Sequence, residues 1–298
     1  MKTLTLIGAG KLAQTLARLW QVNGQFAIQQ VLTRSLLSAE AACDFIGGGE
    51  AIAASAALRP ADVWLIATPD SDIAATAAHL HQLQYQQQPL LQPGTVLFHC
   101  SGALSSTVLA DEASIAVASV HPIHSFASPA ESVQLFAGSF CGYEGDTTAL
   151  AVLKPAFAAI GAQLFAIDGE QKTVYHAASV IACNYLVSLM EASLSCFEAA
   201  GVSRSQAQQL LLPITHQTLD NTLMGSPSTA LTGPISRGDV DTVQQQLTQL
   251  RSQNPLLGQI YASLGLQAVS VAKQQDNRAD PQQLDAIRLL LENAASLH

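Results

Sequence analysis

Short apolar runs alternate with amphipathic stretches up to about residue 168. Helical spacing of apolar positions fills the segments between the runs, as in Lys11–Asn23 and Asp72–Gln84. The runs have the length of β-strands, and they are Thr3–Ile7, Ala27–Thr33, Val63–Ala67, Val96–His99, Ile115–Val120, Ser139–Tyr143 and Gln163–Ala166. The first five are rich in Val, Ile, Leu or Phe, as strands buried on both faces are. This alternation predicts βαβ units, and hence an α/β domain with a doubly wound parallel sheet.

The pattern changes after Asp168, beyond which no strand is predicted. Helical windows follow one another, and they are Gln171–Ala200, Ser203–Asn221, Val240–Arg251, Leu256–Lys273 and Pro281–Ala294. Gly201 suits a helix C-cap and Ser203 an N-cap. The glutamine-rich segments 82–88 and 244–246 are interpreted as solvated helix faces or loops. The sequence therefore predicts an α/β domain at residues 1–168 and an all-α domain at residues 169–298.

Composition narrows the classes of partner. Of the 298 residues, 49% are hydrophobic, and the net charge of −9 leaves only 13 scattered Lys and Arg residues. Nucleic-acid binding needs clustered cations, so no nucleic-acid partner is expected. The apolar run Ala177–Met190 is interrupted by Asn184 and two serines, which makes it too short and polar to cross a bilayer. Five cysteines without metal-site spacing fit buried free thiols, so we expect a cytoplasmic protein without a membrane partner.

A glycine-rich turn follows the first predicted strand and begins the first predicted helix. The segment LTLIGAGKLA contains the G-x-G-x-x-A pattern, with Gly8 for the tight turn and Gly10 for close approach of a pyrophosphate. Ala13 keeps the helix close to the strand, and Lys11, Leu12 and Ala13 at the helix start are expected to bind the cofactor together with the two glycines. Free N–H groups there favour a phosphate. The strand–turn–helix context predicts a Rossmann-type nicotinamide dinucleotide site, and the alternative is a tight turn without a ligand.

The second predicted strand ends in residues that indicate NADPH. NAD-binding proteins usually have Asp or Glu there, whereas Thr33, Arg34 and Ser35 suit a 2′-phosphate. The alternative is that Arg34 is a solvated loop residue. Thr68 and Pro69 follow the third strand and are expected to border the nicotinamide ribose.

Two further strand ends carry polar residues where ligands bind in open α/β sheets. Ser101 and Gly102 are candidates for substrate contact, and the alternative is an ordinary loop in which Ser101 or Asp70 caps a helix. For Asp70 we prefer this second interpretation. His121 and His124 have no third ligand nearby, so a metal site is rejected.

Polar side chains at four-residue spacing mark the start of the helical region. Lys172, His176 and Asn184 lie at positions that follow one stripe of a helix, among Ala, Val and Ile. Such polar groups need a partner or a ligand. His176 can donate a proton near neutral pH, and Asn184 can orient a substrate. Equally, His176 can be a satisfied buried histidine and Asn184 an inter-helix hydrogen bond.

A polar loop, ALTGPISRGD at residues 230–239, is predicted between two helices. Thr232, Ser236 and Arg237 are candidates for holding a substrate carboxylate, which Arg can bind with two parallel hydrogen bonds. The alternative is a plain loop in which Asp239 caps the next helix.

These segments together resemble a bacterial family that joins a Rossmann-like NADP-binding domain to a C-terminal helical domain of unknown function. The segments are GAGKLA, HCSGA, His121-Pro, YHAA…NYL and ALTGPISRGD, and the resemblance covers nearly the whole chain. Some members resemble an alternative ketopantoate reductase, with pyrroline-5-carboxylate reductase and β-hydroxyacid dehydrogenases as wider relatives. The resemblance implies a 6-phosphogluconate-dehydrogenase-like helical domain, a homodimer and an active site in the interdomain cleft.

The resemblance also implies residue roles. Ordinary ketopantoate reductases have a Lys proton donor at the start of this helix and an Asn eight residues later, a spacing shared by His176 and Asn184. His replaces that Lys, so the donor is His176 or Lys172. Ser101 and Thr232 would bind substrate. We expect an NADPH-dependent reductase of a small 2-oxo acid, with ketopantoate as the best guess. The alternatives are a cyclic-imine reductase and a non-catalytic NADP-binding sensor.

Overall fold

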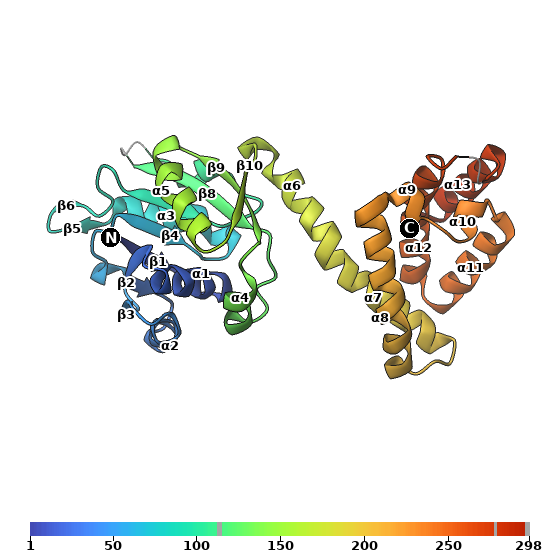
Figure 1. Cartoon of the computed structure of the whole chain (residues 1–298), viewed down its shortest axis with the longest axis horizontal. Helices are drawn as coiled ribbons and strands as arrows, with labels where there is room; N and C mark the ends of the chain where they lie inside the picture. Colours follow the sequence, from blue (N-terminus) through green and yellow to red (C-terminus); the bar gives the residue numbers. More distant parts are fainter. Residues whose placement is uncertain (112–114, 277–278, 296–298) are drawn as a thin grey trace. The chain divides into compact units, whose positions relative to one another are not determined.

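The chain divides into two compact units, residues 1–182 and residues 183–298 (Figure 1). The structure, a computed structural model, describes residues 1–111, 115–276 and 279–295. Strands give way to helices after residue 166, close to the predicted change at 168. The units themselves divide later, because the helix that begins at Lys172 starts within the first unit.

An eight-stranded sheet forms the centre of the first unit, in the order β10-β9-β8-β7-β4-β1-β2-β3. The strands are β1 (Lys2–Ile7), β2 (Phe26–Leu32), β3 (Glu50–Ile52), β4 (Val63–Ile66), β7 (Val96–His99), β8 (Ala116–Pro122), β9 (Phe140–Gly145) and β10 (Gln163–Ala166). All seven predicted strands are present. The sequence missed β3, which is too short to show a period.

The predicted doubly wound parallel sheet is confirmed, with one antiparallel pairing between β8 and β9 that the sequence did not indicate. β9 is antiparallel to β8, with Val120 opposite Tyr143 and His121 opposite Gly142, and β10 is parallel to β9. Strand direction depends on how the connecting chain returns to the sheet, and the apolar pattern of a strand does not record it. The connection here contains α4 (Pro129–Leu135).

Helices cover both faces of the sheet. On one face, α1 (Lys11–Val22), α2 (Leu36–Ile46) and α5 (Thr147–Ala159) contribute to a core in which Trp20 makes edge-on contacts with Phe26, Phe98 and Phe157. On the other face, α3 (Asp70–Gln82) packs against Trp64. The two cores fix the carboxyl ends of the strands, where the candidate site lies.

The glutamine-rich segments fall into different structures. Residues 84–89 form a β-hairpin of β5 (Gln84–Tyr85) and β6 (Gln88–Pro89), which corrects the interpretation of 82–88 as a helix face or loop. Gln86 and Gln87 both have positive φ, the conformation that a two-residue hairpin turn requires. Residues 244–246 are exposed on a helix, as predicted.

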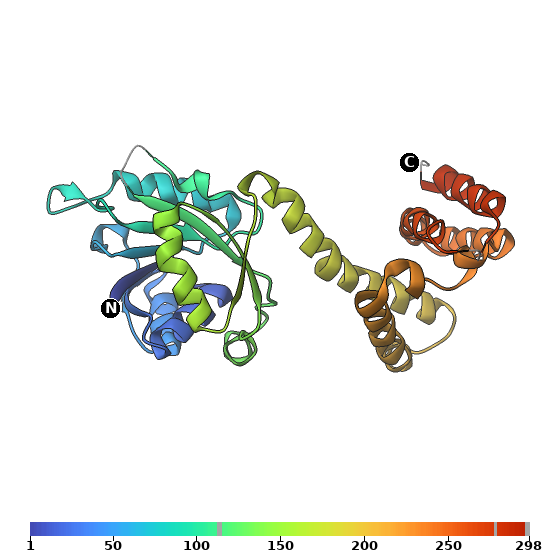
Figure 2. The ribbon, with the colours of Figure 1, turned by 45° about the horizontal axis from the view of Figure 1, so that its top comes forward.

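The second unit is helical throughout its described residues, as predicted. Its helices are α7 (Tyr185–Ala199), α8 (Arg204–Asp220), α9 (Pro227–Ala230), α10 (Pro234–Arg237), α11 (Val240–Gln253), α12 (Pro255–Ala272) and α13 (Pro281–Ala295). Figure 2 shows the last three side by side, around a core that includes Leu247, Val269 and Leu291. Ser203 caps α8 as predicted, and Asp239 caps α11. Residues 230–239 are not a plain loop, because α10 lies within them.

The helix at the start of the helical region is longer than its apolar run. α6 (Lys172–Ser179) continues through a π-helical turn (Val180–Asn184) into α7. A π turn takes more residues than an α turn, so the four-residue spacing does not keep residues 180 and 184 on one stripe. By length and composition alone, the stretch Gly169–Ala199 could cross a membrane, contrary to our expectation from residues 177–190.

The cysteines are all free thiols. Cys100 and Cys141 are buried, as expected, and Cys43 and Cys196 are half-buried. Cys183 is exposed, which corrects the expectation that all five are buried.

Candidate cofactor and catalytic site

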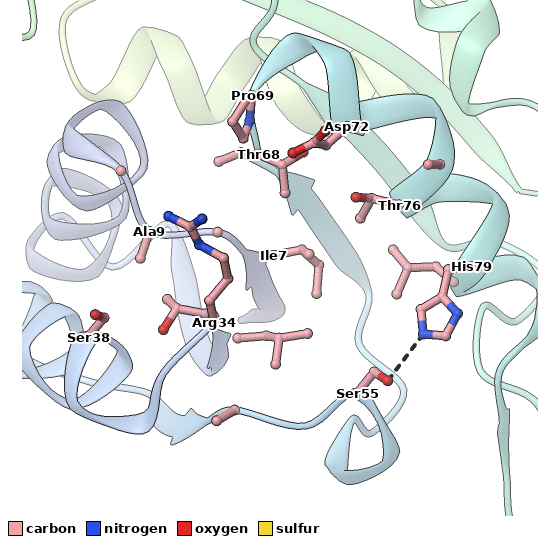
Figure 3. Close-up of a pocket in the computed structure, with 18 residues that line it drawn as sticks. Ile7, Ala9, Arg34, Ser38, Ser55, Thr68, Pro69, Asp72, Thr76 and His79 are labelled. Carbon is pink, nitrogen blue, oxygen red and sulfur yellow. Dashed lines mark hydrogen bonds between the residues drawn. The ribbon is translucent and has the colours of Figure 1, made fainter.

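A cavity of about 940 Å³ opens at the carboxyl ends of β1, β2 and β4 (Figure 3). Six of the predicted cofactor residues line it, namely Gly8, Gly10, Thr33, Arg34, Thr68 and Pro69. These residues come from three separate strand–helix connections. The tertiary structure therefore assembles one ligand-sized space from them.

The glycine turn has the geometry that a pyrophosphate site needs. Gly8 has a φ of +90°, and a Cβ there would lie 2.6 Å from the carbonyl oxygen of Ala67, so only glycine fits. Around Gly10, a Cβ would meet no atom within 4 Å, which leaves room for a ligand. Gly10 is the N-cap of α1 and supplies no side-chain acceptor, so the first N–H groups of α1 can bind an anion.

The other residues of the fingerprint lie outside the cavity lining. Ala13 is fully buried in the core, where it keeps α1 close to the sheet as predicted. Lys11 is exposed and Leu12 is half-buried. Their predicted cofactor contact stays a prediction.

Arg34 and Ser38 form one side of the cavity, with the Arg34 side chain reaching toward Ala9 (Figure 3). Arg34 forms no ion pair with any residue that the structure describes. Ser35 instead caps α2, because its hydroxyl accepts from the N–H of Ser38 and donates to the Ser38 hydroxyl at 2.8 Å. The sequence named Ser35 and missed Ser38, one helical turn later, which lines the cavity in its place.

The opposite side of the cavity carries His79 and Ser55, joined by a 3.1 Å hydrogen bond (Figure 3). Leu32, Ala53 and Leu80 supply apolar surface beside them. This side of the cavity therefore suits a flat base, which stacks on apolar surface and forms hydrogen bonds at its polar edge. These residues carried no signal in the sequence, because His79 lies in the last turn of α3, far from the strand end, and Ser55 follows the undetected β3.

Thr68 shows that the cavity is built for a polar ligand. Its hydroxyl oxygen is buried and has no hydrogen-bond partner among the described residues. A buried hydroxyl without a partner is costly, and a ligand group in the cavity would satisfy it. The residues present therefore fit a dinucleotide.

Asp70 and Ser101 lie next to the cavity in the sequence and at the end of β7, respectively. The Ser101 hydroxyl donates to Asp70 Oδ2 at 2.7 Å and accepts from the N–H groups of Ala103 and Leu104. Asp70 lies inside the first turn of α3, with Pro69 as the N-cap, so it is not the helix cap that we preferred. The Ser101 hydroxyl is thus engaged within the protein.

His99 is held neutral beneath this turn. Its Nδ1 accepts from the Ser101 N–H at 3.1 Å, so Nε2 carries the proton and donates to the Ser105 carbonyl oxygen at 3.3 Å. Burial, followed by the positive charge of Lys172, lowers the pKa of His99 from 6.5 to about 4.

Acidification should therefore destabilise the protein through His99. Between pH 6.5 and 4 the unfolded chain binds a proton that the folded chain does not, so the free energy of unfolding falls as the pH falls. The loss is roughly 3 kcal/mol across this window. In urea unfolding at pH 7 and pH 4.5, which covers most of this window, we expect the loss of stability to be smaller in His99→Asn than in the wild type by most of that amount.

The exposed His216 provides the control for this experiment. His216→Asn should show the wild-type loss. An equal loss in wild type and His99→Asn would show that His99 is not the group that titrates.

A second set of aromatic rings surrounds Gly102. A Cβ at this buried glycine would lie 2.4 Å from His176 Nδ1 and 2.7 Å from His121 Nε2. His121 Nδ1 lies 3.0 Å from the Tyr175 hydroxyl, and the two imidazole centroids are 5.5 Å apart. Nδ1 of His176 is buried without a partner among the described residues. The sequence singled out His176 and Gly102 but gave no role to His121 or Tyr175.

Lys172 forms a buried ion pair. Its side chain is 1% exposed, and Nζ donates to Ser119 Oγ at 2.5 Å and to Glu144 Oε1 at 3.4 Å. The Glu144 carboxylate also accepts from the N–H and hydroxyl of Ser106. Burial lowers the pKa of Lys172, and Glu144 opposes this effect. Lys172 thus has the partner that a polar group on an apolar helix needs.

The remaining predicted residues belong to the second unit. Asn184 is exposed in the π-helical turn. Thr232 is exposed and lines a cavity of about 490 Å³ with Asn221 and Met224, while Arg237 lies outside that lining. Ser236 is buried and donates to Gln275 Oε1 at 2.7 Å, so it is structural.

Two family models match separate segments of the chain. Residues 3–91 match the family described as "NADP oxidoreductase coenzyme F420-dependent", and residues 139–268 match "Domain of unknown function (DUF2520)". The chain is an NADP-dependent oxidoreductase with a DUF2520 domain. The NADP oxidoreductase segment contains the whole cavity lining, which assigns NADP as the cofactor. The DUF2520 segment begins within the sheet unit and includes Glu144, Lys172 and His176.

Solved structures show the same fold. A protein from Thermotoga maritima is 26% identical, with a TM-score of 0.69 over 91% of this chain and 98% of its own. A protein from Bacteroides fragilis, assigned as an NADP oxidoreductase, is 22% identical with a TM-score of 0.72, over 92% and 98%. Pyrroline-5-carboxylate reductase from Streptococcus pyogenes is 14% identical with a TM-score of 0.58, over 99% of both chains. No curated protein matches the chain.

Proposed function

We propose that this oxidoreductase uses NADPH to reduce a small 2-oxo acid, with ketopantoate as the first substrate to test. The observation that supports this most is His176, whose ring lies at the carboxyl ends of β7 and β8, beside Gly102. Ser101, just after β7, is hydrogen-bonded to Asp70, which follows Pro69 of the cofactor cavity in the sequence. When bound, NADPH supplies the hydride, and the chain must supply a proton to the developing alkoxide.

His176 is better suited than Lys172 to supply that proton. Lys172 is fully buried and engaged with Ser119 and Glu144. His176 is half-buried, and Nδ1 is its buried nitrogen, which leaves Nε2 as the nitrogen that can meet a substrate. We assign proton donation to His176 Nε2 and a structural role to Lys172.

The second unit supplies the other candidate groups. Asn184, Thr232 and Arg237 are exposed, and we propose that they orient the substrate and bind its carboxylate. We also propose a cytoplasmic homodimer formed through the helical domain, and a fold like that of 6-phosphogluconate dehydrogenase for this domain. Exposed apolar side chains on this unit support a dimer, among them Val187, Leu212, Leu223 and Met224.

The reaction is tested by calorimetry with NADP(H) and by the loss of NADPH absorbance with a panel of 2-oxo acids and cyclic imines. Turnover of 2-oxo acids, with ketopantoate the best, is the expected result. Turnover of cyclic imines alone would make the chain an imine reductase. NADPH binding without turnover on any compound would favour a sensor.

His176→Gln should lower kcat/KM about 100-fold with NADPH affinity unchanged, because general acid catalysis contributes at least that factor. Asn184→Ala should also lower kcat/KM, through weaker substrate orientation. His216→Gln, at an exposed position on α8, is the matched control and should behave as the wild type. Unchanged kcat/KM in both site variants would place the proton donor elsewhere.

A further inference from the structure

His176 Nδ1 is the feature that the proposed reaction leaves unexplained. A buried ring nitrogen without a partner among the described residues costs free energy in the folded state. The same nitrogen points to the place beside Gly102 on which His121 Nε2 also converges, at 2.4 and 2.7 Å from a Cβ built there. Glycine at position 102 is what allows both imidazoles to occupy this space.

His121 has the properties of a hydrogen-bond acceptor for that nitrogen. Burial, followed by the nearby His176, lowers the pKa of His121 to about 4, so its ring is neutral and one nitrogen has a free lone pair. Burial raises the pKa of Tyr175 to about 12, so its hydroxyl stays protonated. The Tyr175 oxygen can accept from His121 Nδ1–H at 3.0 Å, which leaves the lone pair on Nε2.

We propose that His121 is a positioning residue that accepts a hydrogen bond from His176 Nδ1–H and holds the neutral His176 ring in that tautomer. The proposal builds on His176 as the proton donor of the proposed function. The bond requires a rotation of the His176 ring, and the two nitrogens already face the same space beside Gly102, with ring centroids 5.5 Å apart.

This hydrogen bond determines which nitrogen of His176 exchanges a proton with the substrate. With Nδ1 bound to His121, the proton that His176 exchanges is carried by Nε2. The imidazolium form gives the Nε2 proton to the alkoxide and returns to the neutral Nδ1–H form, and solvent reloads Nε2. Tyr175 and His121 thus play the part that a buried carboxylate plays beside other catalytic histidines. The other charged groups of this unit near the pair are Lys172, Glu144 and Asp70.

Nitrogen NMR of the ¹⁵N-labelled full chain, at a pH where histidines are neutral, tests the proposal without any substrate. We expect His176 to carry its proton on Nδ1 in the wild type and to shift to Nε2 in His121→Leu. His121→Gln, whose amide oxygen takes the place of Nε2, should restore the wild-type tautomer. Tyr175→Phe should give a mixture, and the exposed Tyr185→Phe should have no effect.

Kinetics give a second readout. His121→Leu should lower kcat at least tenfold with KM nearly unchanged, and His121→Gln should recover most of the loss. A wild-type His176 protonated on Nε2, or a tautomer unaffected by His121→Leu, would overturn the proposal. If no compound of the panel is turned over, the proposed function fails while the tautomer measurement still decides the role of His121.

Discussion

Arg34→Asp is expected to weaken NADPH binding about 1,000-fold while NADH binding changes less than about threefold. Arg34 lines the cavity beside Ser38 and forms no ion pair with any described residue, so its charge is available to a 2′-phosphate. Hydrogen bonds to a charged group contribute about 1.5–3 kcal/mol, and the new carboxylate adds like-charge repulsion. NADH has a hydroxyl at that position and escapes both penalties.

Calorimetry with the two reduced dinucleotides measures this effect. Arg251→Asp changes the net charge equally at an exposed position of the second unit and should leave both affinities unchanged. Ser38→Ala should weaken NADPH binding more modestly, since it removes one neutral hydrogen bond. Equal weakening of both dinucleotides by Arg34→Asp would remove the basis for assigning the 2′-phosphate to this residue.

Lys172→Met is expected to lower the free energy of unfolding by about 4 kcal/mol, because it leaves the Glu144 carboxylate buried without its cation. The Glu144 side chain is only 10% exposed, so water cannot replace the lost ion pair. Adding Glu144→Gln removes the buried charge, and the amide oxygen can still accept from Ser106. The double variant should therefore recover about half of the loss.

Lys273→Met provides the comparison. Lys273 pairs with Asp285 at 2.8 Å, but both side chains are about half exposed, so this variant should lose less than about 1 kcal/mol. Urea unfolding of the four proteins measures the difference. Similar losses in Lys172→Met and Lys273→Met would mean that the buried pair contributes no more than a surface pair.

The variants of His176 and Lys172 together test which of the two residues donates the proton. A stable Lys172→Met/Glu144→Gln protein that keeps its turnover would show that Lys172 is structural, as we assign it. A loss of kcat in that protein at unchanged KM would instead return Lys172 to the reaction as a proton donor. The NADPH affinity should be unchanged in either case, because neither residue lines the cofactor cavity.

Much of the cofactor site could be predicted from the sequence, because its requirements are local. Gly8 must be glycine for the turn that follows β1, and Gly10 leaves the start of α1 open, so a short motif records both. The seven longer strands could also be predicted, since burial on both faces imposes a continuous apolar run. The change to helices could be predicted from the change to helical spacing of the apolar positions.

The tertiary structure determined which residues surround these motifs and how the strands next to them run. The sequence could not show that Ser35 is consumed as a helix cap while Ser38 faces the cavity, nor that β9 runs antiparallel to β8. It also could not pair Lys172 with Glu144, 28 positions away, or Tyr175 with His121, 54 positions away. Backbone periodicity and glycine sterics act over a few residues and are written in the local sequence. The partner of a buried polar side chain depends on how distant elements pack, which only the folded chain determines.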